Sequence, residues 1–142
     1  LGYVHADRLT AGLVLEMSLS ENMFLKNSFD PEWVKTIFIN RKKLNGYADK
    51  AIDDYSIKTS GNDELVKALS GGNQQKVVVA REVNIGRKVI IFDQPTRGLD
   101  LGAIDYVHKT ILAERDKGKC VLLISTELSE IFFTLRQDGC SL

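Results

Sequence analysis

The sequence has little of what several classes of protein require. Its 142 residues include two cysteines, Cys120 and Cys140, which are too few for a disulfide framework and do not form a Cys-x-x-Cys pair. Its 19 basic and 19 acidic side chains cancel, so no strong field attracts nucleic acid or an anionic lipid surface. Apolar runs such as Val89–Phe92 are far shorter than the roughly 20 residues of a membrane helix. These scarcities exclude secreted disulfide scaffolds, membrane-spanning proteins and fibrous proteins.

The rest of the composition is that of a globular domain. Apolar residues make up 44% and charged residues 27% of the chain, which is far from the disordered class. The length fits one ordinary domain of about 100–150 residues. His5 and His108 have no second His or Cys at metal-ligand spacing, so we expect them to face solvent or a partner rather than to hold a metal.

The first half of the chain predicts mainly helices. Ser18 and Glu21 have the spacing of a capping box, which predicts a short helix through 22–26. Asp30 and Pro31 form a second helix-start signal. Apolar residues recur after it at helical spacing, namely Trp33, Ile37, Leu44, Tyr47 and Ala51. We therefore expect one amphipathic helix across these residues, with Trp33 packed in the core or in an interface.

The second half predicts alternating helices and strands. Helices are expected over 73–84 and 101–117, buried strands over 89–92 and 121–124, and a further short helix from about Glu127. A strand, a helix and a strand of these lengths form a βαβ unit, whose two strands are parallel with a right-handed crossover. The fold class that follows is α/β.

Residues 69–76 read Leu-Ser-Gly-Gly-Asn-Gln-Gln-Lys, at the start of a predicted helix. Gly71 and Gly72 let the backbone approach an anion closely, and the Ser70 hydroxyl adds a donor. The helix directs its free amides and the positive end of its dipole at the same spot. The stretch predicts a phosphate-binding helix start, although an ordinary Ser-Gly-Gly turn that caps a helix has the same tripeptide.

Residues 89–100 read Val-Ile-Ile-Phe-Asp-Gln-Pro-Thr-Arg-Gly-Leu-Asp. A buried strand that ends in a carboxylate puts Asp93 at the carboxyl edge of a parallel sheet, where ligands bind. An Asp at this place can hold the Mg²⁺ that neutralises nucleotide phosphates. Taken alone, Asp93 is equally compatible with an ordinary turn residue at a strand end.

Together the two stretches resemble the signature motif and the Walker B segment with D-loop of the ATP-binding cassette (ABC) ATPases. The Asn-Gln-Gln-Lys form and the runs 98–109 and 114–119 are similar to ATPase subunits of nucleoside and simple-sugar importers, specifically the second of their two nucleotide-binding domains. Near the front, Asp7-Arg8 and Gly12–Val14 resemble the Glu-Asp-Arg segment of this subgroup. The resemblance extends from about residue 3 to about residue 131.

The resemblance implies a fold and its division. The fold is a partial P-loop NTPase domain with a parallel sheet and a helical subdomain. The helical subdomain with the signature motif would cover about 18–84, and the part with Walker B, D-loop and switch about 85–131. Residues 132–142 form a tail that diverges from the family pattern.

The resemblance also implies which residues contact a nucleotide that a partner domain holds. ABC ATPases work as sandwiches, in which the signature motif of one domain faces ATP held by the other. The residues that would contact this ATP are Ser70, Gly71, Gly72 and Gln74. Asp100 in the D-loop would join the two sites across the interface. The implied cofactors are ATP and Mg²⁺, and the implied partners are a second nucleotide-binding domain and transmembrane permease subunits.

The domain's own nucleotide site departs from the family pattern. Asp93 would bind Mg²⁺, and Gln94 and Thr126 would be the catalytic residues. Gln94 replaces the Glu that polarises the attacking water in most ABC ATPases, and a neutral amide orients water but cannot take its proton. Thr126 replaces the usual switch His, and Ala6 the usual Q-loop Gln or Glu. No Gly-x-x-x-x-Gly-Lys-Ser/Thr loop occurs, so we expect the C-terminal part of a domain, inactive by itself.

Three functions follow as hypotheses. The first is an ATP-binding and ATP-hydrolysing subunit of an importer of simple sugars or nucleosides, cytoplasmic and peripheral on the inner face of the cell membrane, without membrane insertion or nucleic-acid binding. The second is a non-catalytic interaction fragment that supplies only the signature face. The third is an ABC-type ATPase of DNA maintenance. Neutral charge, the lack of coiled-coil heptads and the Asn-Gln-Gln-Lys variant argue against the third.

We predict that the 142-residue chain by itself shows no measurable binding of Mg-ATP. The reason is that neither a phosphate-loop lysine nor an adenine-stacking aromatic is present in the sequence. Isothermal titration calorimetry of the purified chain with Mg-ATP checks this expectation, and tight binding would contradict it.

Overall fold

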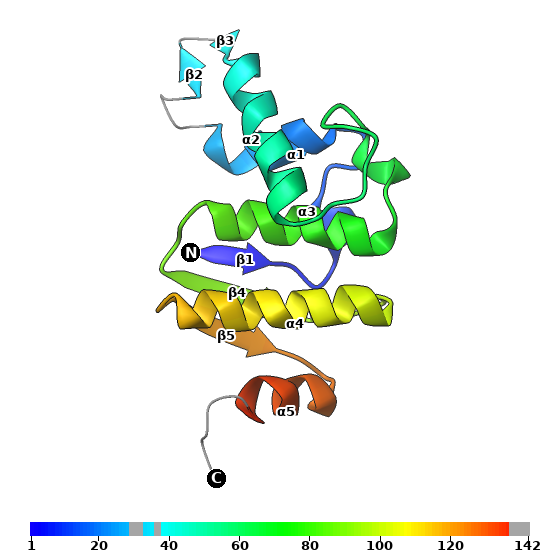
Figure 1. Ribbon diagram of the computed structural model, residues 1–142, viewed down its shortest axis with the longest axis vertical. Helices are drawn as coiled ribbons and strands as arrows, with labels where there is room; N and C mark the ends of the chain where they lie inside the picture. The colour runs from blue at the N-terminus through cyan, green and yellow to red at the C-terminus, as the bar shows by residue number, and fades with distance from the viewer. Residues whose placement is uncertain (29–32, 36–37, 137–142) are drawn as a thin grey trace.

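The computed structural model describes residues 1–28, 33–35 and 38–136. In chain order its elements are β1 (Gly2–Val4), the π-helical turn η1 (Arg8–Gly12), α1 (Leu19–Phe24), the 3-10 turn η2 (Leu25–Asn27), β2 (Val34–Lys35), β3 (Phe38–Ile39), α2 (Arg41–Asp54), the 3-10 turn η3 (Val66–Ala68), α3 (Gly71–Asn84), β4 (Val89–Asp93), α4 (Leu101–Asp116), β5 (Cys120–Ile124) and α5 (Leu128–Arg136). In Figure 1, α1, α2 and the β2–β3 pair lie at one end of the molecule and α5 at the other, with the larger sheet between them. None of the helices in the described ranges has the length and hydropathy of a membrane span.

The larger sheet has three parallel strands in the order β1-β4-β5. Gly2 pairs with Ile90 in one ladder, and Val89 pairs with Cys120 in the other. The predicted βαβ unit is therefore confirmed in its strand direction, with β4 and β5 each one residue longer than predicted. Since the strands are parallel, Asp93 lies at the carboxyl edge of the sheet, as the sequence predicts.

Helix α3 lies between this sheet and the helical end of the molecule (Figure 1). Four consecutive residues, Val77–Ala80, are fully buried, because α3 packs against α1, α4 and β1. An ordinary surface helix buries only one stripe. Ile90 and Phe92 of β4 are also fully buried and complete the core of the sheet.

The helix predicted from the Asp30-Pro31 signal is wrong in its first part. Among the described residues from Trp33 to Ile39, Val34–Lys35 and Phe38–Ile39 form the antiparallel strands β2 and β3, and α2 begins only at Arg41. Asp30 and Pro31 lie outside the described residues. The Asn40 side chain accepts the Lys43 N–H at 3.1 Å, so the helix start is set by this cap instead. Val34, Phe38 and Ile39 are residue types that favour strands, whereas the expected helical stripe counted Trp33, which lies in a turn, and Ile37, which lies outside the described residues.

Other expectations for the first half are confirmed. The Ser18–Glu21 capping box is present, and the helix it starts covers Leu19–Phe24 rather than 22–26. Trp33 packs edge-on against Tyr47, with ring centroids 5.0 Å apart, and lies 6.3 Å from the Phe24 ring. The predicted packing role of Trp33 is therefore confirmed, although Trp33 lies in a turn and not in the predicted helix.

The expectation that His108 faces solvent or a partner is wrong. His108 is buried, with Nε2 3.3 Å from Glu130 Oε1, and its ring stacks on Phe133 at 4.8 Å. These contacts join α4 to α5. The pair of His108 and Glu130 could not be predicted from the sequence, because its two members belong to different helices with a strand between them.

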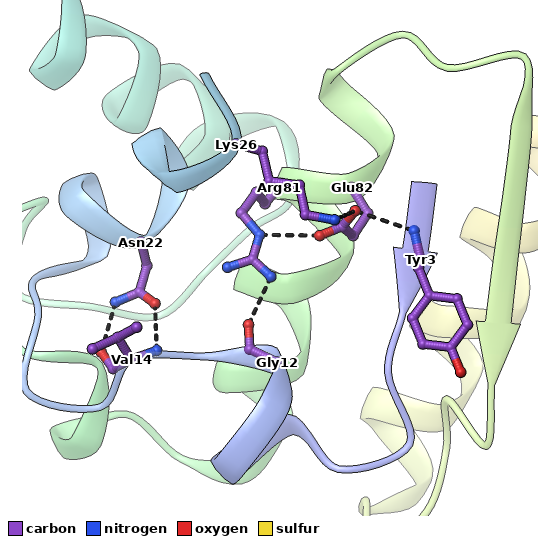
Figure 2. A network of polar contacts seen from close by, with 7 residues as sticks. All are labelled: Tyr3, Gly12, Val14, Asn22, Lys26, Arg81 and Glu82. Atoms are coloured by element: carbon purple, nitrogen blue, oxygen red, sulfur yellow. Dashed lines mark hydrogen bonds and ion pairs between the residues drawn. The ribbon is translucent and has the colours of Figure 1, made fainter. Parts of the chain in front are cut away.

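A buried carboxylate connects α3 to the first strand and to the helical end. Glu82 is 0% exposed, and its Oε2 accepts the Lys26 ammonium at 2.7 Å and the Tyr3 N–H at 3.1 Å. Its Oε1 accepts from Arg81 Nε at 3.1 Å, and Arg81 Nη2 donates to the Gly12 carbonyl at 2.6 Å. Figure 2 shows these contacts converging from β1, η2 and α3. A buried charge is tolerated only when it is paired in this way.

The segment before α1 is held by a second polar contact in Figure 2. Asn22 Oδ1 accepts the Val14 N–H at 2.9 Å, and Asn22 Nδ2 donates to the Val14 carbonyl at 3.0 Å. A side-chain amide thus pairs with a backbone amide as a neighbouring strand would. This contact satisfies the Val14 N–H, which no ladder reaches, whereas the Val14 carbonyl also accepts the Met17 N–H at 3.0 Å.

We predict that Glu82→Ala lowers the free energy of unfolding by about 3–5 kcal/mol, because it leaves the buried Nε of Arg81 and the backbone N–H of Tyr3 without their acceptor. Urea denaturation of the chain measures this loss. Glu16→Ala is the matched control, since Glu16 pairs with Lys67 on the exposed surface, where an ion pair contributes about 0–1 kcal/mol. Equal losses in the two variants would contradict a structural role of the buried network.

We also predict opposite effects of alanine at two helical glycines. A Cβ at Gly72 would lie 3.0 Å from Ala103 Cβ, whereas no described atom lies within 4 Å of a Cβ at Gly46 in α2. Gly72→Ala should therefore lower the free energy of unfolding by about 1–3 kcal/mol through overpacking. Gly46→Ala should raise it by about 0.5–1 kcal/mol. Urea denaturation of both variants checks the difference, and stabilisation by both would show that the starts of α3 and α4 do not pack closely.

Candidate functional site

The start of α3 is the first candidate site. Ser70 is the N-cap, its Oγ accepts the Asn73 N–H at 3.4 Å, and the helix begins at Gly71, two residues earlier than predicted. An α-helix leaves its first amides without partners inside the helix, so those of Gly71 and Gly72 can bind an anion. Ser70 is exposed and both glycines are half-buried. The predicted phosphate-binding helix start is thus accessible at its tip.

Asp100 lies beside this helix start. Its Oδ1 accepts the Ala103 N–H at 2.9 Å and so caps α4. Its Oδ2 would lie 3.5 Å from a Cβ at Gly72. A cleft of about 260 Å³ between the two helix starts is lined by Lys58, Ser70, Gly72, Asn73, Lys76, Asp100, Gly102 and Ala103. The structure thus brings together the signature and D-loop residues that the sequence predicted from positions 30 apart.

Two lysines give the cleft a positive side. Lys76 Nζ donates to the Ser56 carbonyl at 2.7 Å and lies 4.6 Å from the centre of the Tyr106 ring. Burial lowers the pKa of Lys76, and the neighbouring charge of Lys58 lowers it further, against an opposing effect of Asp100. Cations beside free helix amides suit a phosphate. Neither lysine was selected as a site residue from the sequence. Lys58 lies in a loop, and a local sequence pattern does not predict where a loop residue lies in the fold.

The structure separates Gln74 from the other signature residues. Gln74 is buried, and its Nε2 donates to the Val66 carbonyl at 3.1 Å. Its contact with nucleotide stays a prediction. Gln75, which sequence reasoning missed, is also buried and donates to the Pro95 carbonyl at 2.8 Å, so it ties α3 to the loop after β4. A sequence signal existed, since both glutamines lie one helical turn before the apolar pair Val78 and Val79.

The guanidinium of Arg8 lies on the outer side of the same helix start. Arg8 Nη1 donates to the Arg97 carbonyl at 3.1 Å, and Arg8 Nη2 would lie 2.9 Å from a Cβ at Gly71. A side chain at position 71 would therefore have to displace Arg8. Because the guanidinium is the flexible end of the Arg8 side chain, this displacement costs little, and the contact by itself does not require glycine at the first position of α3.

The second candidate site lies at the carboxyl edge of β4 and β5. Gln94 has a φ of 48°, and its N–H donates to the Ile124 carbonyl at 2.8 Å. Its Oε1 accepts the Thr126 hydroxyl at 3.0 Å and the Thr126 N–H at 3.4 Å. The structure thus joins the two predicted catalytic residues across the ends of neighbouring strands. With Oε1 engaged, the amide group left for a water molecule is Nε2, a donor, which can orient water but cannot accept its proton.

Asp93 lies beside this pair and is held by a residue that sequence reasoning missed. The Tyr3 hydroxyl donates to Asp93 Oδ2 at 2.8 Å. This hydrogen bond raises the pKa of Tyr3, because it favours the protonated phenol next to a carboxylate. The sequence signal that could have found Tyr3 is its place in the short apolar run at residues 1–4, which forms β1 of the parallel sheet. One carboxylate oxygen remains for a cation.

The donors at this edge fit Mg²⁺ bound largely through water and phosphate. Within the described ranges no three His, Cys, Asp or Glu side chains gather as a metal cage. Mg²⁺ in nucleotide sites usually takes only one or two carboxylates and keeps several waters. A larger hollow of about 700 Å³ opens at the same edge, and Gln94, Thr126 and His108 are among its lining residues.

Comparison with known proteins tests the resemblance. The family model described as ABC transporter matches residues 1–97, more than half of the chain. The nucleoside import ATP-binding protein NupA of Lactococcus lactis is 44% identical over 131 residues, and the guanosine import ATP-binding protein NupO of Bacillus subtilis is 39% identical over 131 residues. The ribose import ATP-binding protein RbsA of Bacillus licheniformis is 39% identical over 133 residues. Each alignment covers 92% of this chain and 26% of the relative, so the chain spans about a quarter of their length.

Solved structures confirm the fold. The ATP-binding cassette MJ0796, solved as a dimer in a post-hydrolysis state with ADP and Pi, superimposes with a TM-score of 0.71 at 21% sequence identity. The match covers 93% of this chain and 54% of that one. The predicted class, an α/β parallel-sheet domain of the ABC ATPase type present in part, is therefore confirmed. On the match to the family model and on identities of 39–44% to importer ATP-binding proteins, this chain belongs to the ABC transporter family of ATP-binding cassettes.

Proposed function

We propose that this chain is part of the ATP-binding subunit of an importer for nucleosides or simple sugars, and that it supplies the signature face for ATP held by a second nucleotide-binding domain. The observation that carries this proposal is the exposed Ser70 at the start of α3, packed beside Asp100 at the start of α4. The contacts of the face would come from the Ser70 hydroxyl and the first amides of the helix, supported by the two lysines of the cleft.

The solute class and the partners come from the relatives. Their names assign import of nucleoside, guanosine and ribose to proteins that align over 92% of this chain. The solved cassette with the same fold is dimeric and holds ADP and Pi. We propose accordingly a second nucleotide-binding domain and transmembrane permease subunits as partners, with the subunit in the cytoplasm at the inner face of the membrane. These relatives support transport over the DNA-maintenance hypothesis.

The carboxyl edge of the sheet would serve the domain's own nucleotide. Asp93 would hold Mg²⁺, and Mg²⁺ would neutralise the charge of the phosphates. Gln94 and Thr126 would orient the water through the amide that their mutual hydrogen bond fixes. Because this pair lacks a base, we expect slower hydrolysis at this site than at one with a carboxylate.

We predict that Ser70→Arg in the assembled importer abolishes ATP turnover and leaves ATP binding largely intact. The variant removes a donor to the phosphate and fills the place that the phosphate would occupy, and loss of one such donor alone costs at least about 100-fold in rate. Phosphate release measures turnover, and a fluorescent ATP analogue measures binding. Asp63→Arg, at an exposed position outside the cleft, is the control.

Two outcomes would count against the proposal. Loss of ATP binding in Ser70→Arg would show that Ser70 belongs to a site that captures nucleotide rather than to a face that closes on it. Unchanged turnover would show that the signature face of this chain is not used for catalysis.

A further inference from the structure

The Asn73 side chain joins two segments at the start of α3. Asn73 Oδ1 accepts the Lys58 N–H at 2.9 Å, and Asn73 Nδ2 lies 2.9 Å from Ser70 Oγ. A backbone N–H can only donate, so the amide atom facing Lys58 must be the oxygen. The atom facing Ser70 is therefore the NH₂ group, which can only donate. This contact determines the orientation of the amide without ambiguity.

The Ser70 hydroxyl is consequently an acceptor on its inner side. A serine hydroxyl has one proton to donate and two lone pairs that accept. The Asn73 N–H, at 3.4 Å, and the Asn73 NH₂ group, at 2.9 Å, both point at Ser70 Oγ. With both lone pairs engaged, the hydroxyl proton is directed away from Asn73. Since Ser70 is exposed and lines the cleft, that direction leads to solvent.

We propose that Asn73 is a positioning residue, which holds the Ser70 hydroxyl as a donor toward a phosphate oxygen. This inference rests on the proposed function, in which Ser70 contacts ATP. A phosphate oxygen only accepts hydrogen bonds, so a hydroxyl whose proton already points outward needs no reorientation when the phosphate arrives. Asn73 contributes through Ser70 and does not itself contact the nucleotide.

The same side chain links Ser70 to the segment after α2. Lys58 follows the buried Ile57, and one turn along α3 the Lys76 ammonium holds the Ser56 carbonyl at 2.7 Å. Two side chains of α3 thus tie residues 56–58 to the helix that carries Ser70. The Asn73 amide is kept in place only while Lys58 stays there. The direction of the Ser70 proton therefore depends on the position of residues 56–58.

The test uses Asn73→Asp and Asn73→Ala in the assembled importer. Asp keeps the shape and the acceptor for Lys58, but it replaces the donor to Ser70 with a carboxylate oxygen that accepts the Ser70 proton. We expect turnover to fall about tenfold or more in Asn73→Asp, with ATP affinity unchanged, and to fall less in Asn73→Ala. Turnover equal to wild type in both variants would overturn the inference.

A double-mutant cycle separates positioning from direct contact or a merely structural role. In a Ser70→Ala background, Asn73→Ala should cause no further loss of turnover, because the hydroxyl that it orients is gone. Losses that multiply would show that Asn73 acts independently of Ser70 and would overturn the inference. Unchanged turnover in Ser70→Ala alone would instead overturn the proposed function, so the two failures are distinguishable.

A measurement without nucleotide checks the geometry in the 142-residue chain. Hydrogen exchange of the Lys58 amide should stay slow in Asn73→Asp, which retains the acceptor, and should accelerate in Asn73→Ala. Thermal unfolding of both variants shows that they are folded. Equal exchange in wild type and Asn73→Ala would show that Asn73 does not hold Lys58, and would overturn the inference.

Discussion

The rest of the structure depends on the burial of α3, and that burial depends on the charge of Glu82 being neutralised. Helix α3 carries Ser70 and the two glycines at its start and is enclosed on several sides along its middle. A helix in that position can carry a carboxylate only if cations and amides surround it. Lys26, Arg81 and the Tyr3 amide do so from three elements. The network thereby sets α3 against the sheet and against the helical end at once.

This arrangement connects the two candidate sites. Tyr3 gives its N–H to Glu82 and its hydroxyl to Asp93, so the strand that fixes α3 also holds the proposed magnesium ligand. On the other side, Gln75 of α3 binds the Pro95 carbonyl in the loop between β4 and α4. The start of α3 and the carboxyl edge of the sheet are therefore joined by short contacts, of which that of Gln75 is buried. A displacement of α3 would disturb both.

Much of the fold could be predicted because the signals are local. An unbroken apolar run ending in Asp93 specifies a buried parallel strand, and the spacing of Ser18 and Glu21 specifies a capped helix. The helix predicted around Trp33 is wrong, because a short antiparallel pair of strands and a helix can share the same apolar spacing over a few residues. The cap at Asn40 then decided where α2 begins. For the candidate site, Ser70, Gly71, Gly72 and Asp93 stand at the ends of predicted elements. The resemblance to the ABC motifs supplied the others, namely Gln74, Gln94, Asp100 and Thr126.

The sequence by itself determined the family, two of the three parallel strands and the motif residues of the two candidate sites, since each is encoded by neighbours in the chain. Only the tertiary structure decided which side chains those residues meet. The Tyr3 hydroxyl binds Asp93, 90 positions away in the sequence, and the Lys58 N–H binds Asn73 from a loop. His108 contacts Glu130 of another helix. Gln74 turns into the core toward Val66. Such contacts depend on how whole elements pack, because a hydrogen bond of about 3 Å is set by three-dimensional distance and not by separation along the chain.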